Sequence, residues 1–122
     1  MRGDERRVVE AFTAWLRADG WSVRTEVEHC DVVAERDGQR LYCEAKGRVH
    51  RDSVSTDTDT AYGQLLRRMP PVGDNDTRFG LVVPEGAVRS AQRVPARVRA
   101  LLRIDVYSVA DDGTVTVVGS CA

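Results

Sequence analysis

Lys46 is the only lysine in a chain of 122 residues, and seventeen arginines supply the rest of the side-chain positive charge. A lysine that remains in such a chain is expected where a compact ammonium group is needed. It lies in the triplet Glu44-Ala45-Lys46, and a spacing of two residues on a strand places Glu44 and Lys46 on one face. A carboxylate beside a lysine, with a second carboxylate nearby, is typical of metal-dependent phosphodiester cleavage. The alternative is a surface ion pair, which is the commoner meaning of such a triplet.

A β-hairpin is predicted around this triplet. Residues 30–36 and 39–46 are strand-like runs, and Asp37-Gly38 between them is the strongest short signal for a two-residue type I′ turn, because both central residues need positive φ. That turn fixes the register of every pair behind it. One face of the hairpin then carries apolar side chains that suit a core, namely Val32, Ala34, Leu41, Cys43 and Ala45.

The other face of the hairpin carries a pair of carboxylates. The same register pairs Glu35 with Arg40 and places Asp31 directly opposite Glu44. Like charges in such a cross-strand position destabilise a sheet, so a compensating charge is expected. A hard divalent cation, Mg²⁺ or Mn²⁺, held by both carboxylates with water and substrate oxygens, would supply it. The alternative is a solvated acidic edge, which the nearby Lys46 makes less favoured.

The rest of the chain predicts one α/β domain over residues 1–122. A continuously apolar strand at 78–83 is typical of the middle of a sheet that is covered on both faces. The further expected helices are 5–19, a second that begins at Asp57–Asp59 and stops at Pro70, and 86–102 with a break at Pro95; the further strands are 21–27, 104–109 and 114–118.

Composition narrows the function classes. No apolar run approaches a membrane span and no signal peptide is visible, so a cytoplasmic protein without membrane contact is expected. The three cysteines lack C-x-x-C spacing and are expected to be free thiols. A net charge of −1 argues against a protein that coats nucleic acid through bulk charge, although a local arginine patch remains compatible with it.

The chain resembles the PD-(D/E)xK nuclease superfamily in the type and order of four residues: Asp31, Glu44 and Lys46, followed by a helix that bears Gln64. The resemblance is strongest to small single-domain members, such as archaeal-type Holliday-junction resolvases and type IV restriction-like nucleases, and covers residues 5–84. It implies a restriction endonuclease-like core of order α-β-β-β-α-β, with a mixed sheet flanked by helices and an appended C-terminal helix and hairpin. It also implies Mg²⁺-dependent hydrolysis of DNA phosphodiesters.

The resemblance further implies a role for each residue of the motif. Asp31 and Glu44 correspond to the Mg²⁺ ligands, Lys46 to the group that orients and activates the attacking water, and Gln64 to a residue that faces the site. Cys30 stands in the place of the motif's proline, a departure that the superfamily tolerates.

Two questions stay open at the level of sequence. A glutamate of the first helix often joins the site in this superfamily, and here Glu5 shares the apolar helical face whereas Glu10 points away from it. The rival to an enzyme is a catalytically inactive nuclease-like module that binds DNA or protein, and a further rival is a structural protein whose acidic pair is coincidental.

Contacts with macromolecules are also expected. Four arginines near the predicted site are candidates for contact with DNA phosphates, and the alternative for each is a solvated charge: Arg48, Arg51, Arg67 and Arg68. The apolar residues of 94–102 and of the closing hairpin at 104–118 predict a homodimer. The alternative is that they only protect the edge of the sheet.

Overall fold

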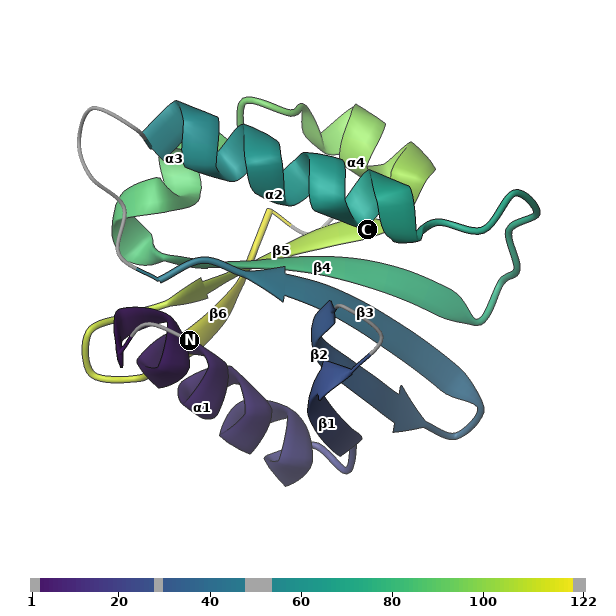
Figure 1. Cartoon of the computed structure of the whole chain (residues 1–122), viewed down its shortest axis with the longest axis horizontal. Helices are drawn as coiled ribbons and strands as arrows, with labels where there is room; N and C mark the ends of the chain where they lie inside the picture. Colours follow the sequence, from purple (N-terminus) through teal and green to yellow (C-terminus); the bar gives the residue numbers. More distant parts are fainter. Residues whose placement is uncertain (1–2, 28–29, 48–53, 120–122) are drawn as a thin grey trace.

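A mixed six-stranded sheet forms the centre of the molecule, and helices cover both of its faces (Figure 1). The computed structural model describes residues 3–27, 30–47 and 54–119. The strand order is β1-β2-β3-β4-β5-β6. The elements are α1 (Gly3–Ala18), β1 (Ser22–Val27), β2 (Cys30–Arg36), β3 (Gln39–Ala45), α2 (Val54–Arg68), β4 (Thr77–Pro84), the 3₁₀-helix η1 (Glu85–Ala87), α3 (Val88–Ala91), α4 (Ala96–Leu102), β5 (Ile104–Val109) and β6 (Val115–Val118).

Strand directions divide the sheet into three parts. Strands β1, β2 and β3 form an antiparallel meander, β3, β4 and β5 run parallel, and β6 returns antiparallel to β5. The apolar strand β4 lies in the middle, as the sequence predicts, because parallel strands are buried on both faces. Helix α1 covers one face, and α2, α3 and α4 lie over the other (Figure 1).

Helix α1 packs through the apolar stripe that its sequence predicts. Val8, Phe12 and Leu16 follow one another at intervals of one helical turn, and they are buried against the sheet. Val9, beside this stripe, is buried with them. The partners on the sheet are the predicted apolar face of the hairpin, since all five of its members are buried in the same cluster. Within the described ranges, no helix is long and apolar enough to cross a membrane.

The β2–β3 hairpin has the predicted turn and register. Asp37 and Gly38 both have positive φ, 51° and 81°. Arg36 pairs with Gln39, and Glu35 pairs with Arg40, whose Nε lies 3.5 Å from Glu35 Oε1. The turn chemistry therefore sets which residues of both strands face the core.

Helix α2 begins earlier than the sequence predicts. It starts at Val54, because the Thr58 hydroxyl donates to the Val54 carbonyl at 3.0 Å and lies 2.6 Å from the hydroxyl of Ser90. Thr58 is buried, so this polar first turn is held by tertiary contacts. The break at Pro95 is confirmed, since α3 ends at Ala91 and α4 begins at Ala96.

The C-terminal hairpin contributes mainly to this chain's own core. Ile104 and Val106 are buried in the cluster beneath α2 and α3, and Val118 packs against it. Leu101 and Val117 stay exposed, at 76% and 40%. The apolar surface that was expected to support a homodimer is thus largely used within the chain, and the homodimer stays a prediction. Cys43 is a buried free thiol, as expected, Cys30 is also buried, and Cys121 lies outside the described residues.

Candidate metal-dependent active site

Asp31 and Glu44 lie side by side on β2 and β3. The pairing of Val32 with Cys43, carried one residue further, places Asp31 opposite Glu44. Asp31 Oδ2 accepts a hydrogen bond of 2.7 Å from the Ala45 amide, so the carboxylate of Asp31 is anchored to the neighbouring strand. The predicted carboxylate pair is therefore present in the structure.

Glu44 is a buried carboxyl group whose charge is only partly compensated by its neighbours. The residue is 4% exposed, and Oε1 has no hydrogen-bond partner among the described residues. Burial, followed by the charge of Asp31, raises the pKa of Glu44 to about 7, whereas Arg68 and Lys46 act in the opposite direction. An unsatisfied carboxylate oxygen in such a position destabilises the fold, and a cation at this oxygen would relieve it.

Lys46 lies on the same face of the sheet as the two carboxylates. Its amide donates to the Val82 carbonyl at 2.9 Å, which continues the pairing of β3 with β4 for one residue beyond the strand. The extended backbone keeps Lys46 on the face of Glu44. Its ammonium group lowers the pKa of both Glu44 and Glu5, so Lys46 lies within electrostatic reach of both carboxylates.

Glu5, and not Glu10, is the first-helix glutamate at the site. Burial and then the charge of Asp31 raise the pKa of Glu5. The first turn of α1 reaches this position because it packs on Gly47, where an added Cβ would lie 2.4 Å from the Glu5 amide nitrogen. Glu10 instead lines a cleft between α1 and β1. A glycine directly after Lys46 was the only sequence signal for this close approach.

Arg68 lies beside the candidate site, because its Nε is 4.0 Å from Glu44 Oε1. Its contact with DNA phosphates stays a prediction. It follows Ala61 and Leu65 on the face of α2 that packs on the sheet, which carries its guanidinium group over β3. Sequence reasoning did not identify this contact, because it depends on how α2 crosses the sheet.

The other predicted residues are only partly located. Gln64 and Arg67 are exposed on α2, and Gln64 precedes Arg68 by one turn. Arg48 and Arg51 lie outside the described residues. Three of the four predicted catalytic residues are thus brought together. The fourth, Gln64, is exposed one turn before Arg68, toward the C-terminal end of α2.

The residues present fit a hard divalent cation. Carboxylate oxygens are the ligands that Mg²⁺ and Mn²⁺ prefer, and Mg²⁺ usually keeps several waters beside one or two carboxylates. In the described part of the chain, no group of three or more His, Cys, Asp or Glu side chains is placed to hold a metal ion. Asp31 and Glu44 would therefore supply two ligands, and Glu44 Oε1 is the atom that most needs a cation.

Comparison with known proteins shows the fold. No family model and no curated protein matches this chain. A crystal structure of an XisH family protein from Nostoc punctiforme has a TM-score of 0.59 at 20% identity, covering 90% of this chain and 96% of that one. A crystal structure of an fdxN element excision controlling factor protein from Anabaena variabilis has a TM-score of 0.60 at 21% identity, covering 94% and 97%. The shared architecture is the restriction endonuclease-like fold.

Proposed function

We propose that this chain is a Mg²⁺-dependent nuclease of the PD-(D/E)xK type that hydrolyses phosphodiester bonds in DNA. The observation that carries the proposal is the buried Glu44 Oε1, which has no hydrogen-bond partner among the described residues and lies beside Asp31 and Lys46. Two adjacent carboxylates, one lysine and a buried oxygen that needs a cation are the donor set of metal-assisted hydrolysis.

Asp31 and Glu44 would hold the metal ion. When bound there, Mg²⁺ or Mn²⁺ polarises a phosphoryl oxygen and makes a nearby water more acidic. The backbone of β3 keeps Asp31 in place through the Ala45 amide, so the donor set is preorganised before the metal binds.

The side chains around the carboxylates have complementary roles. Lys46 would hydrogen-bond the attacking water and stabilise the charge that develops on the phosphate. Glu5 would orient the same water from the opposite element, α1. Arg68 carries a planar group of donors suited to a phosphate oxygen, and it lies close enough to Glu44 to reach a substrate bound there.

The structural neighbours are compatible with work on DNA. The protein from Anabaena variabilis is described as controlling excision of the fdxN element. Its fold and length match this chain over almost their whole extent, and we carry over the class of substrate, DNA, as part of the proposal.

A second candidate function is a nuclease-like module that binds DNA or protein without cleaving it. Two observations favour it: Arg68 already provides Glu44 with a cation 4.0 Å away, and the neighbour is described as a controlling factor. The two functions differ in one respect, because only the nuclease requires a metal at Asp31 and Glu44.

A cleavage assay distinguishes the two functions. Linear, nicked and branched DNA would be incubated with the protein and Mg²⁺, Mn²⁺ or EDTA, with Glu44→Ala as the control variant. We expect products only with a divalent cation and only from the wild type. Intact DNA in every wild-type reaction, from protein that binds the same DNA, would favour the module.

A further inference from the structure

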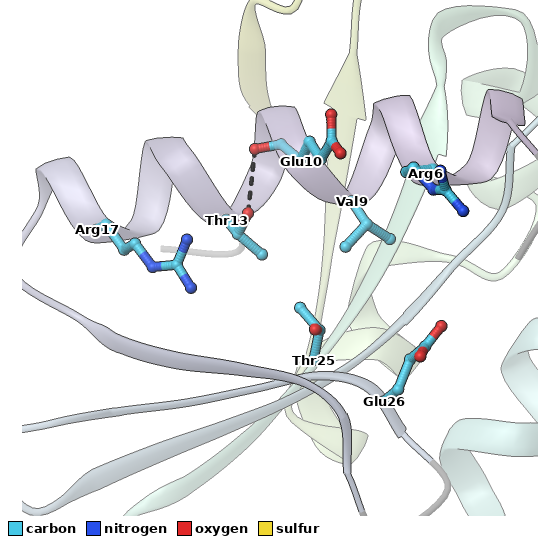
Figure 2. A pocket seen from close by; sticks show the side chains of 7 residues that line it. All are labelled: Arg6, Val9, Glu10, Thr13, Arg17, Thr25 and Glu26. Atoms are coloured by element: carbon cyan, nitrogen blue, oxygen red, sulfur yellow. Dashed lines mark hydrogen bonds between the residues drawn. The ribbon is translucent and has the colours of Figure 1, made fainter.

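A polar cleft lies between helix α1 and the edge strand β1 (Figure 2). Its volume is about 440 Å³, and Val9 forms part of its floor. The remaining lining residues all carry polar side chains, four on α1 and two on β1: Arg6, Glu10, Thr13, Arg17, Thr25 and Glu26. A volume of this size is within the range of ligand-binding clefts.

The helical wall of the cleft is one stripe of polar side chains. Arg6, Glu10, Thr13 and Arg17 follow the spacing i, i+4, i+7, i+11, so they line up along one face of α1. Figure 2 shows the two arginines at opposite ends of this face, with Glu10 and Thr13 between them. At 1.5 Å rise per residue, the two backbone positions are roughly 16 Å apart.

The charges in the cleft do not neutralise one another. Among the residues that the structure describes, none of Arg6, Glu10, Arg17 and Glu26 takes part in an ion pair. All four are exposed. The cleft therefore offers guanidinium groups for an anion and carboxylates for hydrogen-bond donors at the same time.

The backbone of β1 is distorted where it meets this cleft. Glu26 has a φ of 54°, a left-handed conformation that residues with a Cβ rarely adopt. The β1–β2 register places Glu26 opposite Asp31, and regular alternation would give the two side chains one face. Glu26 instead lines the cleft together with its neighbour Thr25. Strained backbone of this kind is common at ligand-binding positions.

The cleft adjoins the candidate active site. Arg6 follows Glu5 directly on α1. Beside burial, the charges of Asp31 and Glu26 both raise the pKa of Glu5, so Glu5 lies within electrostatic reach of the candidate site and of the cleft. A polymer bound at Asp31 and Glu44 would thus meet the Arg6 end of the cleft first.

We infer that the α1–β1 cleft binds the unpaired DNA strand next to the scissile phosphate, with Arg6 and Arg17 on backbone phosphates. This inference rests on the proposed function. Phosphates suit the two arginines, and the exocyclic amino groups of exposed bases suit the carboxylates of Glu10 and Glu26. The same carboxylates would repel the closely spaced phosphates of the two strands of a duplex, whereas a flexible single strand can turn its phosphates toward the arginines and its bases toward the carboxylates.

Salt dependence of DNA binding tests the cleft directly. The probe is a fluorescein-labelled twelve-nucleotide oligodeoxycytidine, whose bases carry exocyclic amino groups, and anisotropy is measured with Ca²⁺ in place of Mg²⁺. Each phosphate contact with single-stranded DNA contributes about 0.7 to the slope of log affinity against log salt. We expect Arg6→Ala with Arg17→Ala to lower this slope by about 1.4 and to weaken binding about tenfold or more at low salt.

Two controls separate the cleft from the active site. Arg97→Ala removes an exposed arginine from α4, on the other face of the sheet, and should leave the slope unchanged. Hydrolysis of thymidine 5′-p-nitrophenyl phosphate, which is too short to reach Arg17, should proceed at the wild-type rate in the double variant.

The outcomes are distinguishable. If the double variant has the slope and affinity of the wild type, the proposal that the cleft binds DNA is wrong, whether or not the protein hydrolyses the small substrate. A reduced slope in the double variant, together with a wild type that hydrolyses neither DNA nor the small substrate, would support the proposed cleft and refute the nuclease.

Discussion

Replacing Glu44 with glutamine should stabilise the metal-free protein at high pH. The substitution keeps the shape of the side chain and removes its charge. Burial and Asp31 raise the pKa of Glu44 from 4.5 to about 7, so the folded state holds this proton more tightly than the unfolded chain does. The stability contributed by the protonated carboxyl is therefore complete below pH 4.5 and is lost as the pH rises through 7.

The size of the effect follows from the same shift. One pKa unit corresponds to about 1.4 kcal/mol, and a shift from 4.5 to about 7 gives at most about 3 kcal/mol. The wild type should lose up to this amount of unfolding free energy, relative to Glu44→Gln, between pH 4.5 and pH 8. Because Glu44 is only 4% exposed, bulk solvent removes little of this penalty.

Urea unfolding in EDTA, followed by tryptophan fluorescence at a series of pH values, measures the difference. A matched control is Glu35→Gln, which removes a half-exposed carboxylate from the neighbouring strand β2. Saturating Mg²⁺ should restore the unfolding free energy that the wild type loses at pH 8, because the ionised carboxylate of Glu44 binds the cation. It should leave the unfolding free energy of Glu44→Gln unchanged. A difference in unfolding free energy between wild type and variant that does not change with pH, or a variant less stable than the wild type at pH 8, would show that the buried charge of Glu44 does not destabilise the fold.

Three further substitutions test the site. Lys46→Arg should keep the fold and the Mg²⁺-induced rise in melting temperature but lower single-turnover cleavage by about 10²-fold or more, and an unchanged rate would remove Lys46 from the chemistry. Gly47→Ala should destabilise the protein by about 1–3 kcal/mol in urea unfolding, since its Cβ would meet the backbone of Glu5; wild-type stability would show that α1 does not pack there. Arg68→Ala should bind Mg²⁺ about tenfold more tightly in calorimetry, because a cation that competes for Glu44 is gone, and weaker binding would contradict that competition.

The sequence predicted the hairpin because its signals are local. Asp37-Gly38 determines the turn, the turn determines the register, and the period of two then assigns every side chain to a face. The carboxylate pair follows from the same arithmetic, and so does the side of the sheet on which Lys46 lies. These features need no knowledge of how distant elements pack.

The features that sequence reasoning missed all depend on distant contacts. The first turn of α1 meets Gly47 from more than forty positions away, and Arg68 approaches Glu44 only because α2 crosses above β3. The early start of α2 depends on Ser90, which lies far along the chain. The left-handed φ of Glu26 has no sequence signal, since glutamate rarely adopts it.

The proposed hydrolysis requires a divalent cation at Asp31 and Glu44. Anomalous diffraction from crystals grown with Mn²⁺ tests this most directly. We expect a single strong peak, or a close pair of peaks, within ligand distance of carboxylate oxygens from both residues, with Arg68 withdrawn from Glu44. Crystals that show no peak there, with the Arg68 guanidinium closed onto Glu44, would contradict it.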